Sequence, residues 1–463
     1  MGGTIEGTIV TTAKLPARTV PLLYLATAHA SLALATLLTA CWPQAVAGFF
    51  YHSWMLSVVH LVTLGWITFS ILGAIYIVGP LALRMEMPVR RLDYVAYGFA
   101  LVGLIGMVGH FWIQEYRGMA WSAAMIACSV LYTTIRIVLG VRHAAMHPAV
   151  KLHLTLACIN FWVAASMGLL IAFDKAKHFL PGFVLSNVFA HAHLAALGWA
   201  TMMVVGVGYR LLPMTIPSKM PSGRSLYASA ILLETGVLGL FTTLLRRSAW
   251  TIAFGLAIVA GLLVFAAHVL WMLHQPVSKP VGAPRFNFGL LHAAGAGASL
   301  GAAAAFGLAL LIAPMSSRTL PAAAAYGVLG LVGFLAQMVV AMEARLLPMV
   351  TWFLAYAGSG YRVPPPSPHT MRDRSLQAIV YGGWTVGVPA LSAGMFFESA
   401  RLVGVGAWAL FVGVAVATLD NAFVVAHAST HSAISASTTR FGNSSGAMGG
   451  APERIFSNSV APG

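Results

Sequence analysis

Apolar stretches long enough to cross a membrane recur along the whole of this 463-residue chain. The hydrocarbon core of a bilayer is about 30 Å thick, and an α-helix needs about 20 consecutive apolar residues to cross it. Hydrophobic residues make up 59% of the chain and charged residues only 8%, whereas soluble domains carry about 25% charged residues. We therefore expect an all-α integral membrane protein without a soluble domain.

The apolar stretches number about twelve, and their ends are defined to within a few residues. They lie near residues 20–41, 53–79, 94–113, 119–141, 151–173, 185–212, 225–245, 250–272, 287–313, 321–349, 375–397 and 401–428. A twelve-helix membrane domain over residues 20–428 follows a short cytoplasmic N-terminal segment, residues 1–19. Residues 429–463 are rich in Ser, Gly, Ala and Asn, and we expect them to form a disordered cytoplasmic tail.

The basic residues lie mainly in the short connections between these stretches. In a soluble protein the formal net charge of +15 would indicate a nucleic-acid partner, but short basic connections are typical of the cytoplasmic side of a membrane protein. The more basic connections alternate with less basic ones and contain Lys14, Arg18, Arg84, Arg90, Arg91, Arg142, Lys151, Lys219, Arg224, Lys279, Arg285, Arg362, Arg372 and Arg374. This asymmetry predicts a multi-pass protein of the cell inner (cytoplasmic) membrane, in contact with the lipid bilayer, with both termini in the cytoplasm and no nucleic-acid partner.

One motif occurs in the second, sixth and tenth spans. "HLVTLGWITFSILGAIYIVGP" begins at His60, and "HLAALGWATMMVVGVGYRLLP" begins at His193. They share the initial His-Leu, the Leu-Gly-Trp triplet, a later Gly and the final Pro without a gap. A weaker third copy, "VLGLVGFLAQMVVAMEARLLPM", begins at Val328 and lacks the histidine.

Because the motif recurs in every fourth span, the sequence predicts three pseudo-repeated four-helix units. Their approximate limits are residues 20–142, 150–272 and 287–428. The Gly-aromatic pair of each copy is expected to let neighbouring helices approach closely. The final Pro is expected to stop the helix, as prolines just beyond a helix end do.

The repeated histidines, His60 and His193, are the part of the motif that packing alone does not explain. Ionisable groups inside a membrane are costly and are often functional, and a neutral imidazole is the commonest metal ligand. His191 is a third candidate, but at 100° per residue it lies about 200° around the helix from His193. Those two side chains are therefore not expected to share one ligand face.

Three more candidate ligands, His29, His153 and His292, each lie in the first helix of a unit. For every one of these histidines the alternative is a simple hydrogen bond to a neighbouring helix. Glu343 lies in span ten, two residues before Arg345; its plain interpretation is pairing with that arginine or snorkelling of the side chain to the cytoplasmic surface.

With these features the chain resembles subunit I of the haem-copper oxidases, a superfamily that includes the cbb3-type oxidases and the nitric oxide reductases. The resemblance rests on twelve spans in three four-helix units, with candidate ligand histidines in spans two and six. The stretch from His191 to Met214 is also similar to the haem- and copper-containing NnrS proteins of the nitric oxide response.

The resemblance implies haem b as a cofactor and copper as a second metal. It implies His60 as a ligand of the low-spin haem and His193 or His191 as a copper ligand. The family also has histidines in spans seven and ten, and this chain has none there. Oxygen reduction at the usual binuclear centre is therefore not expected.

The function that follows is electron transfer, or the handling of nitric oxide or another diatomic gas. The implied partners are a c-type cytochrome or a quinol as electron donor, and other membrane subunits. Two alternatives stay open. One is a membrane transporter or metal-handling permease built on the same repeats, and the other is a non-catalytic structural subunit whose histidines only pack and form hydrogen bonds.

Overall fold

The computed structural model describes residues 18–278, 287–358 and 367–444, with side chains described up to residue 426 of the last helix. Within these ranges the protein is built of helices and has no β-strand. Twelve of the helical segments are long and apolar enough to cross a membrane. The predicted all-α, multi-pass fold is thus confirmed, and its apolar helices imply contact with a lipid bilayer.

The helices follow the order of the three predicted units. The first unit contains α1 (Thr19–Cys41), α2 (Pro43–Val46), α3 (Ser53–His60), η1 (Leu61–Thr68), α4 (Phe69–Leu81), α5 (Arg91–Ile113) and α6 (Tyr116–His143). The second contains α7 (Pro148–Lys177), α8 (Val184–His193), η2 (Leu194–Thr201), α9 (Met202–Thr215), α10 (Ser225–Arg246) and α11 (Thr251–Leu273). The third contains α12 (Phe288–Ile312), α13 (Thr319–Gly327), η3 (Val328–Ala336), α14 (Gln337–Gly358), η4 (Pro368–Thr370), α15 (Arg374–Phe396) and α16 (Ala400–Ser444).

Span ends agree with the predictions to within a few residues, apart from two helices that run on. The interpretation of the motif proline as a helix stop is wrong in the third copy, because Pro348 lies inside α14, which continues to Gly358. Pro80 and Pro213 also lie inside their helices, close to the ends. The last helix, α16, continues to Ser444, beyond the expected boundary at residue 428. The rest of the tail, residues 445–463, lies outside the described residues.

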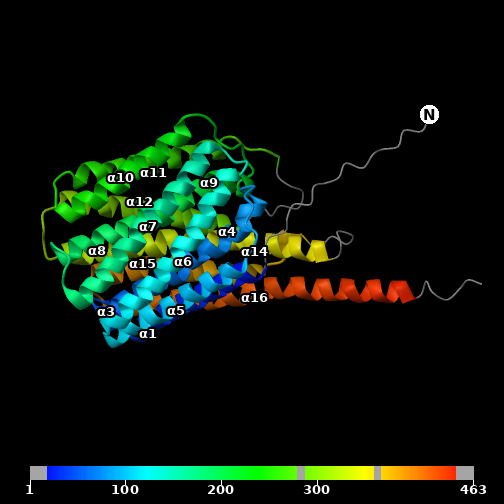
Figure 1. Ribbon diagram of the computed structural model, residues 1–463, viewed down its shortest axis with the longest axis horizontal. Helices are drawn as coiled ribbons and strands as arrows, with labels where there is room; N and C mark the ends of the chain where they lie inside the picture. The colour runs from blue at the N-terminus through cyan, green and yellow to red at the C-terminus, as the bar shows by residue number, and fades with distance from the viewer. Residues whose placement is uncertain (1–17, 279–286, 359–366, 445–463) are drawn as a thin grey trace, which may run out of the picture.

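The spans run side by side along the long axis of the molecule (Figure 1). The connections with Arg84, Arg90, Arg142 and Arg372 lie at one end, which we call the basic end; the connections between α1 and α3 and between α7 and α8 lie at the opposite end. Each unit packs on the next through α6 with α7 and α11 with α12, and α1 packs on α16. The three units therefore form a closed ring.

Close glycine contacts join the first two helices of every unit. A Cβ atom built on the motif glycine would lie 2.5–2.9 Å from a side-chain atom of the first helix. The pairs are Gly65 with Ser31, Gly198 with Asn160, and Gly333 with Ser299. The predicted packing role of this glycine is confirmed in all three units, since any side chain there would push the two helices apart.

Candidate functional site

Each motif copy contains a stretch of π-helix. The three stretches, η1, η2 and η3, interrupt the second span of each unit within one residue of the same motif position, directly after His60, His193 and Gly327. The three stretches contact one another at the centre of the ring. π-helical turns are rare and frequently mark functional sites, so these stretches make the middle of the bundle a candidate functional region.

Hydrogen bonds between the π-helical stretches follow a cyclic order. The indole N–H of Trp199 donates to Thr68 of the first unit at 3.3 Å. The indole N–H of Trp66 donates to the carbonyl of Ala336 in the third unit at 3.1 Å. Thr68 and Ala336 occupy equivalent positions in their copies, so each tryptophan reaches the same place on the preceding unit of the ring. Phe334 replaces the tryptophan in the third copy and has no N–H to donate.

The same order appears at the basic end of the motif. Arg210 donates to the carbonyl of Ala82 in the first unit at 2.9 Å, and Arg345 donates to the carbonyl of Met214 in the second unit at 3.1 Å. Arg345 therefore does not pair with Glu343, and that interpretation is corrected: the arginine caps carbonyls at the end of a neighbouring helix, as helix C-termini require. The units thus share the contacts that each makes with the preceding unit, as well as the motif residues.

His60 has one ring nitrogen held and one left free. Its Nδ1 donates to the carbonyl of Leu56 at 2.7 Å, and its ring stacks on Phe111 with centroids 5.2 Å apart. Within the described residues, Nε2 of His60 has no hydrogen-bond partner. This atom is also not fully buried. Nε2 therefore carries the lone pair of a neutral imidazole and keeps accessible surface.

His191 and His193 point in different directions, as their spacing predicted. His193 donates from Nδ1 to the carbonyl of Phe189 at 2.8 Å, and its Nε2 accepts from the hydroxyl of Tyr326 at 3.1 Å. His191 donates from Nδ1 to the carbonyl of Ala164 on α7 at 3.0 Å. Its Nε2 has no partner within the described residues and also keeps accessible surface.

The cyclic order brings His191 to His60. Tyr326 lies two residues before the motif start of the third unit, as His191 does in the second. Its ring stacks on His193 with centroids 5.7 Å apart. By the same cyclic order, His191 of the second unit is directed toward the position of His60 in the first unit. His60 and His191, rather than His60 and the repeated His193, are therefore the candidate pair.

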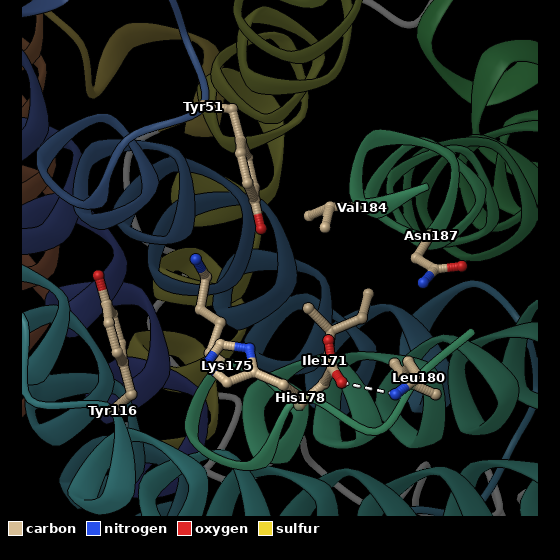
Figure 2. Close-up of a pocket in the computed structure, with 9 residues that line it drawn as sticks. Tyr51, Tyr116, Ile171, Lys175, His178, Leu180, Val184 and Asn187 are labelled. Atoms are coloured by element: carbon tan, nitrogen blue, oxygen red, sulfur yellow. Dashed lines mark hydrogen bonds between the residues drawn. The ribbon is translucent and has the colours of Figure 1, made fainter. Parts of the chain in front are cut away.

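A cavity lies beyond this pair toward the opposite end of the bundle. Its volume is about 250 Å³, and its lining includes Asn187, one turn before His191 on α8, and Ile171, two turns after Ala164 on α7. Figure 2 shows the ammonium group of Lys175 directed between two tyrosine rings; it lies 4.8 Å from the centroid of Tyr51 and 5.1 Å from that of Tyr116. The cavity thus contains the ammonium group of Lys175 between two aromatic rings, on the side of the histidine pair that faces the opposite end.

The three first-helix histidines do not join this pair. His153 bonds to the carbonyl of Ala149 and to Ser229 at 2.8 and 2.9 Å. His292 accepts from Gln337 at 3.4 Å and its ring packs on Tyr381. Both nitrogens of His29 are also engaged, in a separate polar cluster at the other side of Trp66. These contacts match the alternative of simple interhelical hydrogen bonding.

The histidine pair suits haem iron better than a bare ion. Among the residues that the structure describes, no three His, Cys, Asp or Glu side chains gather closely enough to hold a metal ion. Copper and zinc sites in proteins usually have three or four protein ligands, so the donor set does not fit the expected copper. A haem supplies four nitrogens itself and needs only one or two axial ligands. His60 and His191 fit that role, because ligating histidines characteristically donate their other N–H to a carbonyl.

Several partners of this site could not be read from the sequence. Tyr326 and the carbonyl of Ala164 belong to other spans, and no spacing pattern ties them to the motif. The small residue at Gly168 leaves room for the His191 ring, since a Cβ atom there would lie 2.8 Å from its Cε1. Only Tyr326 could have been suspected from the sequence, because it aligns with His191 when the third copy of the motif is superimposed on the second.

Comparison of the sequence with models of known protein families found no match, and comparison with curated proteins found none either.

Proposed function

We propose that this membrane protein binds one b-type haem through His60 and His191 and uses it to transfer electrons. One observation carries the proposal: both imidazoles donate from Nδ1 to main-chain carbonyls and leave Nε2 free. That arrangement selects the tautomer that an axial ligand needs and holds the ring in place. The resemblance to haem-copper oxidase subunit I supports the His60 half of the proposal, because it implies His60 as a haem ligand; for His191 it implies copper instead, and the proposal departs from it there.

Two axial imidazoles favour electron transfer over the binding of nitric oxide or another gas. When bound, the haem would supply an iron that cycles between ferrous and ferric states. His60 and His191 would both hold the iron, and the chain would then leave no site on it for a diatomic ligand. The chain's own contribution is to hold both half-buried rings in place by hydrogen bonds to main-chain carbonyls.

The orientation of the protein bears on its electron donor. The histidine pair lies in the first third of spans two and six, nearer the opposite end of the bundle than the basic end. The positive-inside rule places the basic end, with both termini, in the cytoplasm. We propose a location in the cell inner membrane, where a c-type cytochrome at the outer face or a quinol from the bilayer would reach the pair over a short distance.

An optical spectrum of the detergent-purified protein tests the proposal. We expect a Soret band that shifts on reduction with dithionite, the spectrum of a low-spin six-coordinate haem, and one iron per chain by metal analysis. The His60→Ala and His191→Ala variants should lose most of this absorption. His193→Ala is the matched control: it removes a histidine two residues away whose Nε2 is already occupied by Tyr326, and it should keep the haem.

Three results would contradict the proposal in different ways. A colourless wild-type protein from haem-replete cells would favour the transporter or structural alternatives. Loss of haem in His193→Ala but not in His191→Ala would move the second ligand to the repeated histidine. A high-spin haem that binds carbon monoxide or nitric oxide would favour gas handling over electron transfer.

A further inference from the structure

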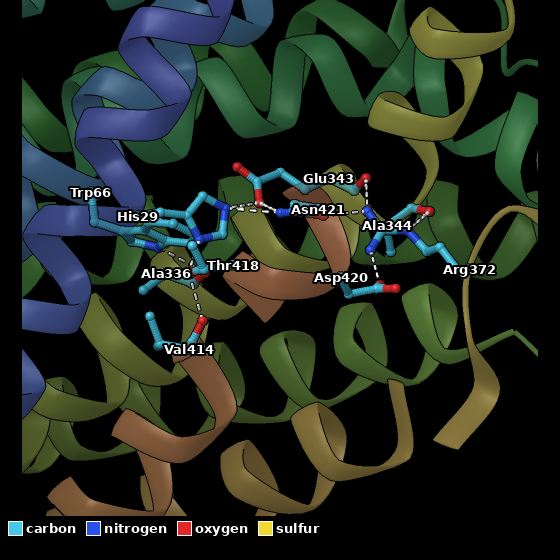
Figure 3. Close-up of polar contacts among 10 residues, drawn as sticks. All are labelled: His29, Trp66, Ala336, Glu343, Ala344, Arg372, Val414, Thr418, Asp420 and Asn421. Atoms are coloured by element: carbon cyan, nitrogen blue, oxygen red, sulfur yellow. Dashed lines mark hydrogen bonds and ion pairs between the residues drawn. The ribbon is translucent and has the colours of Figure 1, made fainter. Parts of the chain in front are cut away.

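A second buried polar cluster lies toward the basic end, where α1, α14 and α16 meet. Figure 3 shows His29, Glu343, Asn421 and Arg372 in one connected set. His29 and Glu343 are 5% and 4% exposed, and Nε2 of His29 lies 2.9 Å from Oε2 of Glu343. No part of the proposed haem site touches this cluster, so it requires an explanation of its own.

The tautomer of His29 follows from its neighbour on α16. The hydroxyl of Thr418 donates its single hydrogen to the carbonyl of Val414 at 2.8 Å. Its oxygen lies 2.9 Å from Nδ1 of His29 and can only accept there. Nδ1 of His29 therefore carries a hydrogen, and in a neutral imidazole Nε2 would be a bare lone pair.

The orientation of Asn421 is equally determined. Arg372 donates to Oδ1 of Asn421 at 2.6 Å, and a guanidinium has no acceptor. The amide nitrogen of Asn421 must therefore point the other way, where it lies 2.9 Å from Nε2 of His29 and 3.1 Å from Oε2 of Glu343. This amide can donate to either atom but cannot accept from them.

These assignments leave one proton to be accounted for. A neutral His29 and an ionised Glu343 would set two lone pairs against each other at 2.9 Å, which is repulsive. The contact is a hydrogen bond only if one proton lies between Nε2 and Oε2, either on the imidazole or on the carboxyl group.

The charges of the cluster demand the same proton. Its two carboxylates, Glu343 and Asp420, face a single guanidinium, Arg372, which pairs with Asp420 and also donates to the carbonyls of Glu343 and Ala344. An uncompensated charge is strongly disfavoured inside a bilayer. One bound proton brings the cluster to neutrality.

The geometry points to a proton-binding site formed by His29 and Glu343, which hold one proton between them and exchange it with the aqueous phase at the basic end. Arg372 leads from the cluster to the connection before α15 at that end. Oε1 of Glu343 is buried without a hydrogen-bond partner in the described structure, and such an acceptor suits an arriving water or proton. The inference does not depend on the haem.

Other charged groups near the cluster are directed elsewhere. Arg345, on the same helix as Glu343, donates to the carbonyl of Met214. His369, on η4 against α14, has its pKa lowered by burial and by the positive charge of Arg345, so it is neutral at physiological pH. Arg372 and Asp420 are thus the charges that act directly on the pair.

Infrared difference spectroscopy on the full chain in lipid nanodiscs tests the site. When the pair loses its proton, we expect one carboxyl band and one imidazole band to change together, with the release of one proton per chain. Glu343→Gln keeps the shape and a hydrogen-bond donor but cannot release a proton, so it should lose both band changes. Labelling of the histidines with ¹³C should shift the imidazole band.

Glu234→Gln is the matched control. The carboxyl group of Glu234 accepts from Asn160 at 2.8 Å and has no imidazole partner in the described structure, so the variant should keep both bands.

Two outcomes would overturn the inference. The first is an unchanged pair of bands in Glu343→Gln. The second is a response of the same bands to sodium ions at constant pH, which would make the site one for a monovalent cation. If Glu343→Gln does not fold, the ¹³C-histidine label on the wild-type protein still decides, because carboxyl and imidazole bands that titrate separately would exclude a shared proton.

Discussion

The protein contains two histidine regions, one half-buried and one buried, in which the same side chain has different hydrogen-bond partners. His60 and His191, toward the opposite end, each use one ring nitrogen on a main-chain carbonyl and leave the other free. His29, toward the basic end, uses both nitrogens on side chains of other helices, one of them a carboxyl group. The first arrangement suits a metal ligand and the second a proton carrier. The partner of the second nitrogen, rather than the histidine itself, decides the chemistry.

The two regions also differ in how they depend on charge. The His29 cluster contains a buried ion pair between Arg372 and Asp420, whereas hydrogen bonds to neutral carbonyls hold His60 and His191. Buried charges are sensitive to the loss of a partner, and neutral hydrogen bonds much less so. The basic-end cluster should therefore dominate stability, while the histidine pair should dominate ligand binding.

The largest effect is expected from Asp420→Asn. It leaves the Arg372 guanidinium buried without its full counter-charge, and breaking a buried pair in this way costs about 3–5 kcal/mol. Thermal or chemical unfolding in detergent measures the loss. Asp373→Ala is the control, because Asp373 only caps α15 through the N–H groups of Ser375 and Leu376 and its loss should cost about 1 kcal/mol. Equal losses in the two variants would show that the ion pair is not a main support.

Next in size is the contrast between His29→Ala and His60→Ala, both measured without haem. His29→Ala leaves Glu343 and Asn421 without an imidazole partner and should cost about 2–3 kcal/mol. His60→Ala removes one bond to a carbonyl of its own helix and should cost about 1 kcal/mol. The same unfolding assay compares them, and the reverse order would contradict the distinction between the two regions.

A smaller loss is expected from Trp66, which borders the His29 cluster. Trp66 packs edge-on against His29 at 5.0 Å between ring centroids and donates to the carbonyl of Ala336. Trp66→Phe keeps the ring and removes the donor, and should cost about 1 kcal/mol, in the range of interhelical hydrogen bonds in membranes. Trp408→Phe, at a position 46% exposed on the outside of the bundle, should change the unfolding temperature far less.

The smallest effect concerns pH at the opposite end. His52 lies just before α3, accepts from the N–H of Met55, and has its pKa lowered mainly by burial. The unfolded chain therefore binds a proton more readily, so stability falls as the pH drops below about 6.5, the ordinary histidine pKa. The loss should be about 0.5–1 kcal/mol, the worth of an N-cap. His52→Asn keeps a capping oxygen and should remove this part of the pH dependence; an unchanged profile would assign it to another group.

The sequence predicted the spans closely because the bilayer imposes one length and one polarity on every helix. Its motif also located the glycines that pack against Ser31, Asn160 and Ser299, since a repeated glycine repeats its packing. It misassigned Glu343, because proximity in sequence to Arg345 was a poor guide when both side chains turn toward other helices. It ranked His193 above His191 because the motif repeats His193; our proposal prefers His191 because its Nε2 has no hydrogen-bond partner in the described residues, whereas that of His193 accepts from Tyr326.

The sequence alone determined a twelve-span, three-unit membrane protein, because hydrophobic length and internal repetition are local properties that survive any packing. Only the tertiary structure decided which histidines share a site. The closed ring sets each unit against the one before it, and this order brings His191 to His60, Tyr326 to His193 and Glu343 to His29. Those pairings join residues separated by more than 100 positions, and their chemistry depends on hydrogen-bond partners that no local pattern encodes.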